Sequence, residues 1–316
     1  MNGKNMQRPN ELKQNKSKQF YLIYVIGLFT LTSCASTLVN TFVRYERNKA
    51  SLTKKEIQVE NHKIVYLEGG EGETILLIHG FGADKEHWTR MSRYLTDKYR
   101  VISPDLPPFG ESTKLDSEDY GVLPQAKRVH LFTQALGLKK YHIVGNSMGG
   151  HIAGVYTSEY PDEVLSLALF DAAGVTSPNP SKLSEKLKEG KNPLIVSNEE
   201  EFDGLMKFSF VNPPYIPGFF KREVMKKAAA NKPYSEKVFS KLMQDGNVLE
   251  KRLSKIKAKT LILWGDSDNI IDVSSVQVFE KGIVNHKTVI LKECGHAPMI
   301  ELPEESAKQY LNFIQN

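Results

Sequence analysis

A serine flanked by glycines constrains the fold of this chain more than any other feature. It lies in the stretch Gly145-Asn146-Ser147-Met148-Gly149-Gly150. The apolar run 141–144 precedes this stretch and a helix-like segment, 150–156, follows it, which predicts a strand-to-helix turn at Ser147. Such a turn is a nucleophile elbow, in which the serine backbone is strained and its neighbours are crowded. Glycine at positions 145 and 149 avoids collisions with the helix and the adjacent strand.

Serine with this spacing also occurs in ordinary glycine-rich loops, so the interpretation depends on partners elsewhere in the chain. A serine hydroxyl needs a base to take its proton and a carboxylate to orient that base. The apolar run 288–291 leads into Cys294-Gly295-His296, which predicts a histidine just after the carboxyl end of a strand. We therefore expect Ser147 to be the nucleophile and His296 the general base.

Several aspartates follow predicted strands and compete for the role of the acid: Asp171, Asp266, Asp268 and Asp272. We predict that Asp268 orients His296 and stabilises its charged form. Asp171, which ends an earlier strand, is the alternative acid. The other two are interpreted as solvated loop charges or helix caps.

A site for acyl transfer also needs N–H donors that face the oxyanion of the tetrahedral intermediate. The predicted strand 74–78 is followed directly by His79-Gly80-Phe81-Gly82, whose glycines allow a tight turn toward the serine. We expect the backbone amides of Phe81 and Met148 to form this oxyanion hole.

The distribution of apolar runs predicts an α/β fold. Strand-like and helix-like segments alternate from about residue 56, which indicates a mostly parallel sheet with helices on both faces. With 316 residues and 40% hydrophobic content, the chain is large enough to bury one substantial core. Strands are expected near residues 56–67, 74–79, 99–104, 141–146, 165–171, 259–264 and 287–292.

The core is predicted to comprise residues 51–175 and 258–316, with a helical lid inserted at 176–257. The insertion combines lysine-rich helical sequence with an apolar segment, 208–220, that prolines prevent from forming one regular helix. This apolar segment has two interpretations: a wall that receives an acyl chain near a membrane, or the packed interior of the lid.

Charge argues against nucleic acid as a partner. The formal net charge is +5, but most of the excess lies in residues 4–18, so the remainder of the chain is nearly neutral. The sequence has no zinc-ligand spacing and no phosphate-binding loop. We expect no metal and no cofactor.

Residues 1–50 are interpreted as a targeting segment with a linker. The basic leader precedes the apolar stretch 20–31, which has the length of a signal peptide. It ends in Leu31-Thr32-Ser33-Cys34, which resembles a bacterial lipobox and predicts lipidation of Cys34 and a membrane-bound lipoprotein. The alternative is a single uncleaved anchor that extends to Val43.

The only other cysteine is Cys294, so at most one disulfide is possible, and none is expected if Cys34 carries lipid. Cys294 lies two residues before the predicted base. It is interpreted as a packing residue rather than a second nucleophile.

Over residues 56–316 the chain resembles the α/β-hydrolases, and within them membrane-associated monoacylglycerol lipases and related bacterial lipases. The resemblance lies in four motifs: His79 to Trp88, Gly145 to Tyr156, Trp264-Gly265-Asp266-Ser267-Asp268, and Cys294-Gly295-His296. It implies hydrolysis of carboxylic esters of medium or long acyl chain, without a cofactor, on a lipid or ester substrate.

Two other functions remain open. The elbow sequence also resembles hydrolases that cleave carbon–carbon bonds in ring-fission products, although these usually have Gly-Pro-Gly after the His-Gly pair and arginine where Asn269 stands. Dehalogenases and epoxide hydrolases use an aspartate nucleophile, so Ser147 argues against them. A non-catalytic binding protein with this fold is expected to lack a member of the triad, and none is missing here.

Overall fold

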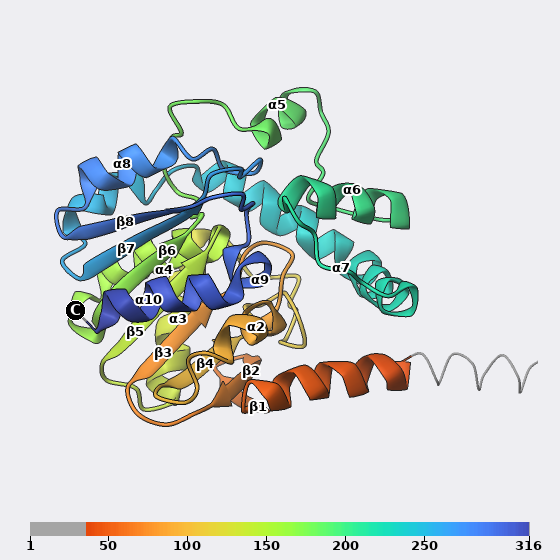
Figure 1. Cartoon of the computed structure of the whole chain (residues 1–316), viewed down its shortest axis with the longest axis horizontal. Helices are drawn as coiled ribbons and strands as arrows, with labels where there is room; N and C mark the ends of the chain where they lie inside the picture. Colours follow the sequence, from red (N-terminus) through yellow and green to blue (C-terminus); the bar gives the residue numbers. More distant parts are fainter. Residues whose placement is uncertain (1–35, 316) are drawn as a thin grey trace, which may run out of the picture.

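The computed structural model describes residues 36–315, which form an eight-stranded sheet with helices on both faces (Figure 1). The strand order is β1-β2-β4-β3-β5-β6-β7-β8. Strand β2 runs antiparallel to both of its neighbours, and all the other pairs are parallel. The strands are β1 (Leu52–Val59), β2 (His62–Gly69), β3 (Thr74–Ile78), β4 (Arg100–Pro104), β5 (Tyr141–Asn146), β6 (Val164–Phe170), β7 (Lys259–Gly265) and β8 (His286–Leu291). The predicted α/β fold is confirmed.

One strand prediction is wrong. The segment 56–67 is not a single strand but parts of β1 and β2, which form a hairpin with Val59 opposite His62. The chain reverses at Glu60, whose φ is 49°. The turn contains neither glycine nor proline, and its one turn-forming residue, Asn61, is a weaker signal that sequence reasoning did not use. The other six strands lie within one or two residues of their expected ranges.

The helices and 3₁₀ turns connect these strands. Residues 36–49 form the first helix. The others are η1 (Lys85–Trp88), α2 (Thr89–Ser92), α3 (Val122–Ala135), α4 (Met148–Glu159), η2 (Pro161–Glu163), α5 (Lys182–Lys188), α6 (Glu199–Ser209), α7 (Gly218–Asp245), η3 (Glu250–Lys255), α8 (Ser275–Gly282), α9 (Pro298–Glu301) and α10 (Pro303–Ile314).

The hydrophobic core has two layers, one on each face of the sheet. Successive side chains of β3 alternate between them, because side chains of a strand point to opposite faces in turn. Leu76 and Ile78 pack in the layer that includes residues of α3, α4 and α8. Ile75 and Leu77 pack in the layer that includes residues of α2, α9 and α10. All four strand residues are fully buried.

The insertion between β6 and β7 contains α5, α6, α7 and η3. Figure 1 shows α5, α6 and α7 standing off one end of the sheet. Helices α6 and α7 have a small core of their own around Phe202 and Met225. The irregular stretch 210–217 separates α6 from α7, as expected for the proline-containing segment.

The helix of residues 36–49 is attached to the core and to the insertion. The Arg47 guanidinium binds the Glu86 carboxylate of η1 with its Nε 3.0 Å from Oε1, and the Phe42 ring contacts Phe220 of α7 edge-on at 5.7 Å between centroids. Within residues 36–315, no helix is long and apolar enough to cross a bilayer. The predicted lipidation site, Cys34, and the leader lie outside the described residues.

Candidate active site

The predicted strand-to-helix turn is present between β5 and α4. Ser147 has φ 56° and ψ −122°, a strained conformation for a residue with a side chain. A Cβ on residue 145 would lie 2.2 Å from the Gly149 carbonyl oxygen, and one on residue 149 would lie 2.3 Å from that of Ile78. Only glycine fits these two positions, so the sequence dictates the sharp turn that presents Ser147.

The histidine and the acid selected from the sequence are brought into contact. The Nδ1 of His296 lies 2.7 Å from Oδ2 of Asp268. The other carboxylate oxygen, Oδ1, accepts the N–H groups of Ile270 and Ile271 at 2.7 and 3.1 Å. Both side chains are almost completely buried. A carboxylate at Nδ1 favours the tautomer with the proton on that atom, which leaves Nε2 as the basic nitrogen.

Asn146, which sequence reasoning did not select, joins the histidine loop to the elbow. Its side-chain amide donates to the carbonyl of His296 at 3.0 Å and to that of Phe170 at 3.1 Å. The backbone N–H of His296 donates to the carbonyl of Ser209, at the end of α6, at 2.8 Å. The position of His296 therefore depends on both the elbow and the insertion. The only signal for Asn146 in the sequence is its place next to Ser147.

The alternative acid, Asp171, does not make the direct hydrogen bond to the imidazole, although one of its carboxylate oxygens lies within 4.8 Å of Asp268 and of His296. It follows β6 with φ 46° and is fully buried. Its Oδ1 accepts the N–H of Gly265 at 2.9 Å. Burial, and then the charge of Asp268, raise the pKa of the Asp171 carboxyl well above its ordinary value.

Among the described residues, one group of three acidic or histidine side chains is compact enough to surround a cation. It consists of Asp171, Asp268 and His296, whose potential ligand atoms lie within 4.8 Å of one another. Within this group, Asp268 and His296 share a hydrogen bond of 2.7 Å. We therefore interpret Asp268 and His296 as hydrogen-bond partners, with the Asp171 carboxyl group next to them.

The loop expected to form the oxyanion hole lies against the elbow. A Cβ on Gly80 would lie 3.2 Å from the Cβ of Ser147, so this loop approaches the serine as closely as glycine allows. Among residues 36–315, neither the Phe81 N–H nor the Met148 N–H has a protein acceptor. Both donors thus remain available for a ligand oxygen.

A buried histidine shapes this loop. His79 accepts the N–H of Leu106 through Nε2 at 2.9 Å and donates from Nδ1 to the carbonyl of Gly80 at 2.8 Å. Burial lowers the pKa of His79 to about 4, which keeps the ring neutral and able to make both bonds. The bond to Gly80 engages the carbonyl of the residue just before Phe81.

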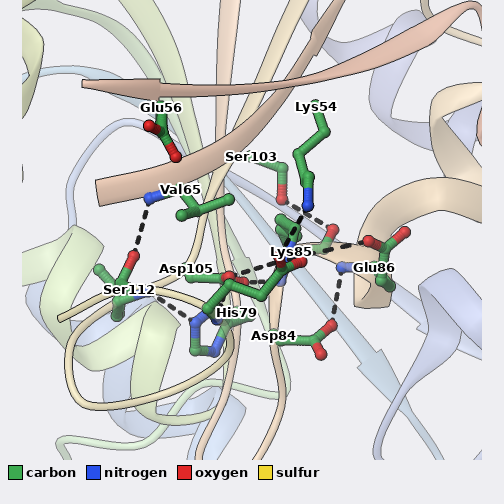
Figure 2. Close-up of polar contacts among 12 residues, drawn as sticks. Lys54, Glu56, Val65, His79, Asp84, Lys85, Glu86, Ser103, Asp105 and Ser112 are labelled. Carbon is green, nitrogen blue, oxygen red and sulfur yellow. Dashed lines mark hydrogen bonds and ion pairs between the residues drawn. The ribbon is translucent and has the colours of Figure 1, made fainter. Parts of the chain in front are cut away.

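A buried lysine supports the segment that follows the loop. The Nζ of Lys85 lies 2.8 Å from Asp105 and 2.9 Å from Glu111, and its backbone N–H donates to Asp105 at 2.7 Å (Figure 2). Burial alone lowers the pKa of Lys85, but the carboxylates around it outweigh burial and raise that pKa above its ordinary value. Nothing in the local sequence indicates this network, because its members lie up to 26 residues apart.

Cys294 is buried and unpaired. Burial, followed by the carboxylates of Asp171, Glu301, Asp268 and Asp266, raises the pKa of its thiol, so the reactive thiolate is disfavoured. A cavity of about 550 Å³ lies nearby, between the start of the insertion and the loop that carries Asp268. Phe210 and Val211 contribute apolar surface to its lining.

Comparison with known proteins gives one family match and three similar proteins. The family model described as alpha/beta hydrolase fold matches residues 73–194. Lipase 1 of Psychrobacter immobilis is 37% identical over 93% of this chain and 95% of its own length. Monoacylglycerol lipase ABHD6 of Bos taurus is 29% identical over 88% of this chain and 87% of its own. The crystal structure of a membrane phospholipase A, described as a bacterial virulence factor, has a TM-score of 0.91 and 42% identity, and the match covers 96% and 99% of the two chains.

Proposed function

Because this chain belongs to the α/β-hydrolase family and is an ester hydrolase of the lipase type, we propose that Ser147, Asp268 and His296 are its catalytic triad. The contact of 2.7 Å between His296 and Asp268 is the observation that carries the proposal. The strained turn at Ser147 and the bond from Asn146 to the His296 loop add support.

In the proposed mechanism, Nε2 of His296 takes the proton of the Ser147 hydroxyl as its oxygen attacks the ester carbonyl carbon. Asp268 stabilises the imidazolium. The Phe81 and Met148 N–H groups donate to the oxyanion of the tetrahedral intermediate. The intermediate collapses, His296 protonates the departing alcohol, and an acyl-serine remains. Water, deprotonated by His296, then attacks the acyl-serine, and the carboxylic acid leaves as Ser147 regains its proton.

We propose that the substrate is an ester with a medium or long acyl chain, such as a monoacylglycerol. Two relatives named lipase and monoacylglycerol lipase support this class. The insertion at 176–257, which we propose to be a lid, adds Phe210 and Val211 to the cavity near Asp268. The rest of the lining is mostly polar or charged, so the preference for a hydrocarbon chain rests on the relatives.

We also propose that the enzyme works at a membrane surface. The helix of residues 36–49 exposes Leu38, Phe42 and Tyr45 by 45% to 55%, and Tyr215 in the insertion is 87% exposed. Exposed apolar side chains on two neighbouring elements are typical of a surface that contacts lipid.

We further propose that Cys34 is lipidated after the leader is cleaved. Mass analysis of the mature protein tests this, and an intact Met1 leader would contradict the lipoprotein.

The first experiment is a substrate panel with the full chain. It contains p-nitrophenyl esters of increasing chain length, a monoacylglycerol and a ring-fission diketone. We expect turnover of the esters and the monoacylglycerol, reduced about 10⁴-fold or more in Ser147→Ala. Ser254→Ala, an exposed serine of η3, is the matched control and should keep wild-type activity.

Each other outcome identifies an alternative. Turnover of the diketone alone would move the assignment to carbon–carbon hydrolysis. Full ester turnover by Ser147→Ala would show that another residue is the nucleophile, and no turnover of any substrate would favour a binding protein.

A further inference from the structure

Two carboxyl groups meet at the carboxyl ends of β6 and β7. The proposed triad uses Asp268. A carboxylate oxygen of Asp171 lies within 4.8 Å of a carboxylate oxygen of Asp268. One oxygen of Asp171, Oδ1, accepts the N–H of Gly265. The other, Oδ2, is buried, and no donor among the described residues reaches it. An acceptor oxygen without a donor is costly in the interior of a protein.

A proton on Asp171 resolves this conflict. Two neighbouring carboxylates cannot both be charged in a buried site without a large electrostatic cost, so one of them holds a proton. Asp268 already receives two backbone N–H groups and the imidazole of His296, which stabilise its negative charge. Asp171 receives a single N–H. The charge therefore belongs on Asp268 and the proton on Asp171.

The other titratable groups around Asp171 favour the same assignment. The carboxylate of Glu301, from α9, raises the pKa of Asp171 further, after burial and Asp268. The thiol of Cys294 stays neutral because its own pKa is raised. The cationic form of His296 is balanced by the direct partner of its imidazole, Asp268.

We propose that Asp171 is protonated at neutral pH and donates a hydrogen bond to Asp268, and so positions the acid of the proposed triad. This role rests on the proposed function. Asp171 does not touch the substrate, so it is a positioning residue. The hydrogen bond from Asp171 holds Oδ2 of Asp268 toward His296. The two carboxyl groups then place one negative charge, instead of two, beside the imidazole.

The first test measures the proton directly in the full chain. Asparagine has the shape of protonated aspartate, and its amide donates from the same position, so Asp171→Asn is the matched variant. The infrared difference spectrum of wild type minus Asp171→Asn should contain the C=O stretch of a protonated carboxylic acid at neutral pH. A carboxylate band in its place would overturn the proposal. The same infrared comparison can be made between Ser147→Ala and the double variant Ser147→Ala with Asp171→Asn. It detects the proton on Asp171 in protein that does not turn over substrate.

Stability provides a second readout. A carboxyl group that is protonated when folded and ionised when unfolded lowers stability as pH rises above the unfolded pKa, because the folded state binds more protons. Asparagine does not titrate. The melting temperature of Asp171→Asn should therefore exceed that of wild type by a few degrees at neutral pH, and this difference should shrink toward pH 4. A variant that is less stable than wild type by the same amount at every pH would contradict the proposal.

Activity measurements distinguish a positioning role of Asp171 from the role of triad acid. Asp171→Asn should keep kcat/KM within about fivefold of wild type with an unchanged pH profile. Asp171→Ala should lower kcat at least tenfold at similar KM, and its pH profile should change, since Asp268 loses a hydrogen-bond donor. If Asp171→Asn loses as much activity as Asp268→Asn, Asp171 is itself the acid. If Asp268→Asn and Ser147→Ala both stay active, the proposed function fails. The infrared spectrum still shows whether Asp171 is protonated.

Discussion

Hydrogen bonds from side chains to backbone carbonyls help to place the candidate site. The amide of Asn146 donates to the His296 carbonyl, and His79 donates to that of Gly80. The first bond holds the proposed base, His296, relative to the turn at Ser147, and the second shapes the loop of the proposed oxyanion hole. Small displacements of reacting groups are costly in catalysis, so residues that never meet the substrate are expected to affect kcat.

Asn146→Ala removes both bonds from the side-chain amide. We expect kcat to fall about tenfold or more with little change in KM, because the His296 loop loses its anchor to the elbow. The variant should also be less stable by about 1–3 kcal/mol, since two buried carbonyls lose a donor. Steady-state kinetics and urea unfolding measure the two effects, and Asn285→Ala, at an exposed asparagine, is the control. Wild-type kcat in Asn146→Ala would show that the loop is held by other contacts.

At the scale of elements, segments that are distant in the sequence are joined around the site. The helix of residues 36–49 contacts η1 through Arg47 and α7 through Phe42. Since η1 directly follows the oxyanion loop, this helix links the exposed apolar surface to the region of the site. The proposed membrane contact thus involves an element that is fixed to the core and not a loose extension.

Replacement of exposed apolar side chains on this helix tests the membrane proposal. In Leu38→Ser with Tyr45→Ser, hydrolysis of a monoacylglycerol embedded in phospholipid vesicles should fall on the order of tenfold, because each buried apolar side chain contributes about 1.5–3 kcal/mol. Hydrolysis of a soluble short-chain ester should not change. Val284→Ser, at a residue that is 95% exposed between α8 and β8, is the matched control. Equal losses on both substrates would indicate a damaged fold and no role in lipid contact.

At the scale of the whole molecule, the fold buries ionisable groups in their neutral forms, and global stability depends on pH through them. His151, in α4, is 3% exposed, and its Nε2 has no partner among the described residues. Burial, and then Arg252, lower its pKa to about 3. As pH falls, His151 therefore binds a proton near pH 6.5 in the unfolded chain but only near pH 3 in the folded protein. The buried carboxyl group of Asp171 has a raised pKa and acts in the opposite direction.

A comparison of His151→Gln with wild type isolates one of these contributions. Below the unfolded pKa of 6.5, wild type loses stability as pH falls because of His151, and the variant does not. Relative to wild type, the variant should gain about 1 kcal/mol for each pH unit between pH 6 and 4. Urea unfolding at pH 8, 6, 5 and 4 measures the difference. A constant difference at all four pH values would mean that folded His151 titrates normally.

Some features of the site could be predicted because their causes are local. The glycines at 145 and 149 permit only a sharp turn at Ser147, and Asp268 and His296 follow apolar runs that form the buried strand β7 and the edge strand β8. In a parallel sheet, the carboxyl ends of neighbouring strands meet at one edge. Spacing and polarity alone therefore indicated which residues gather there, and the α/β fold with them.

Other features depend on distances that no pattern along the chain encodes. The choice of Asp268 over Asp171 as the partner of His296 is made by a contact of 2.7 Å between groups 28 residues apart. The bond from Asn146 spans 150 residues. The hairpin at Glu60 has only Asn61 as a turn-forming residue, without glycine or proline. The local sequence thus determined which elements form and where the reactive groups lie on them. Tertiary packing alone decided which groups meet and which are buried without charge, because burial and long-range contacts are properties of the assembled core.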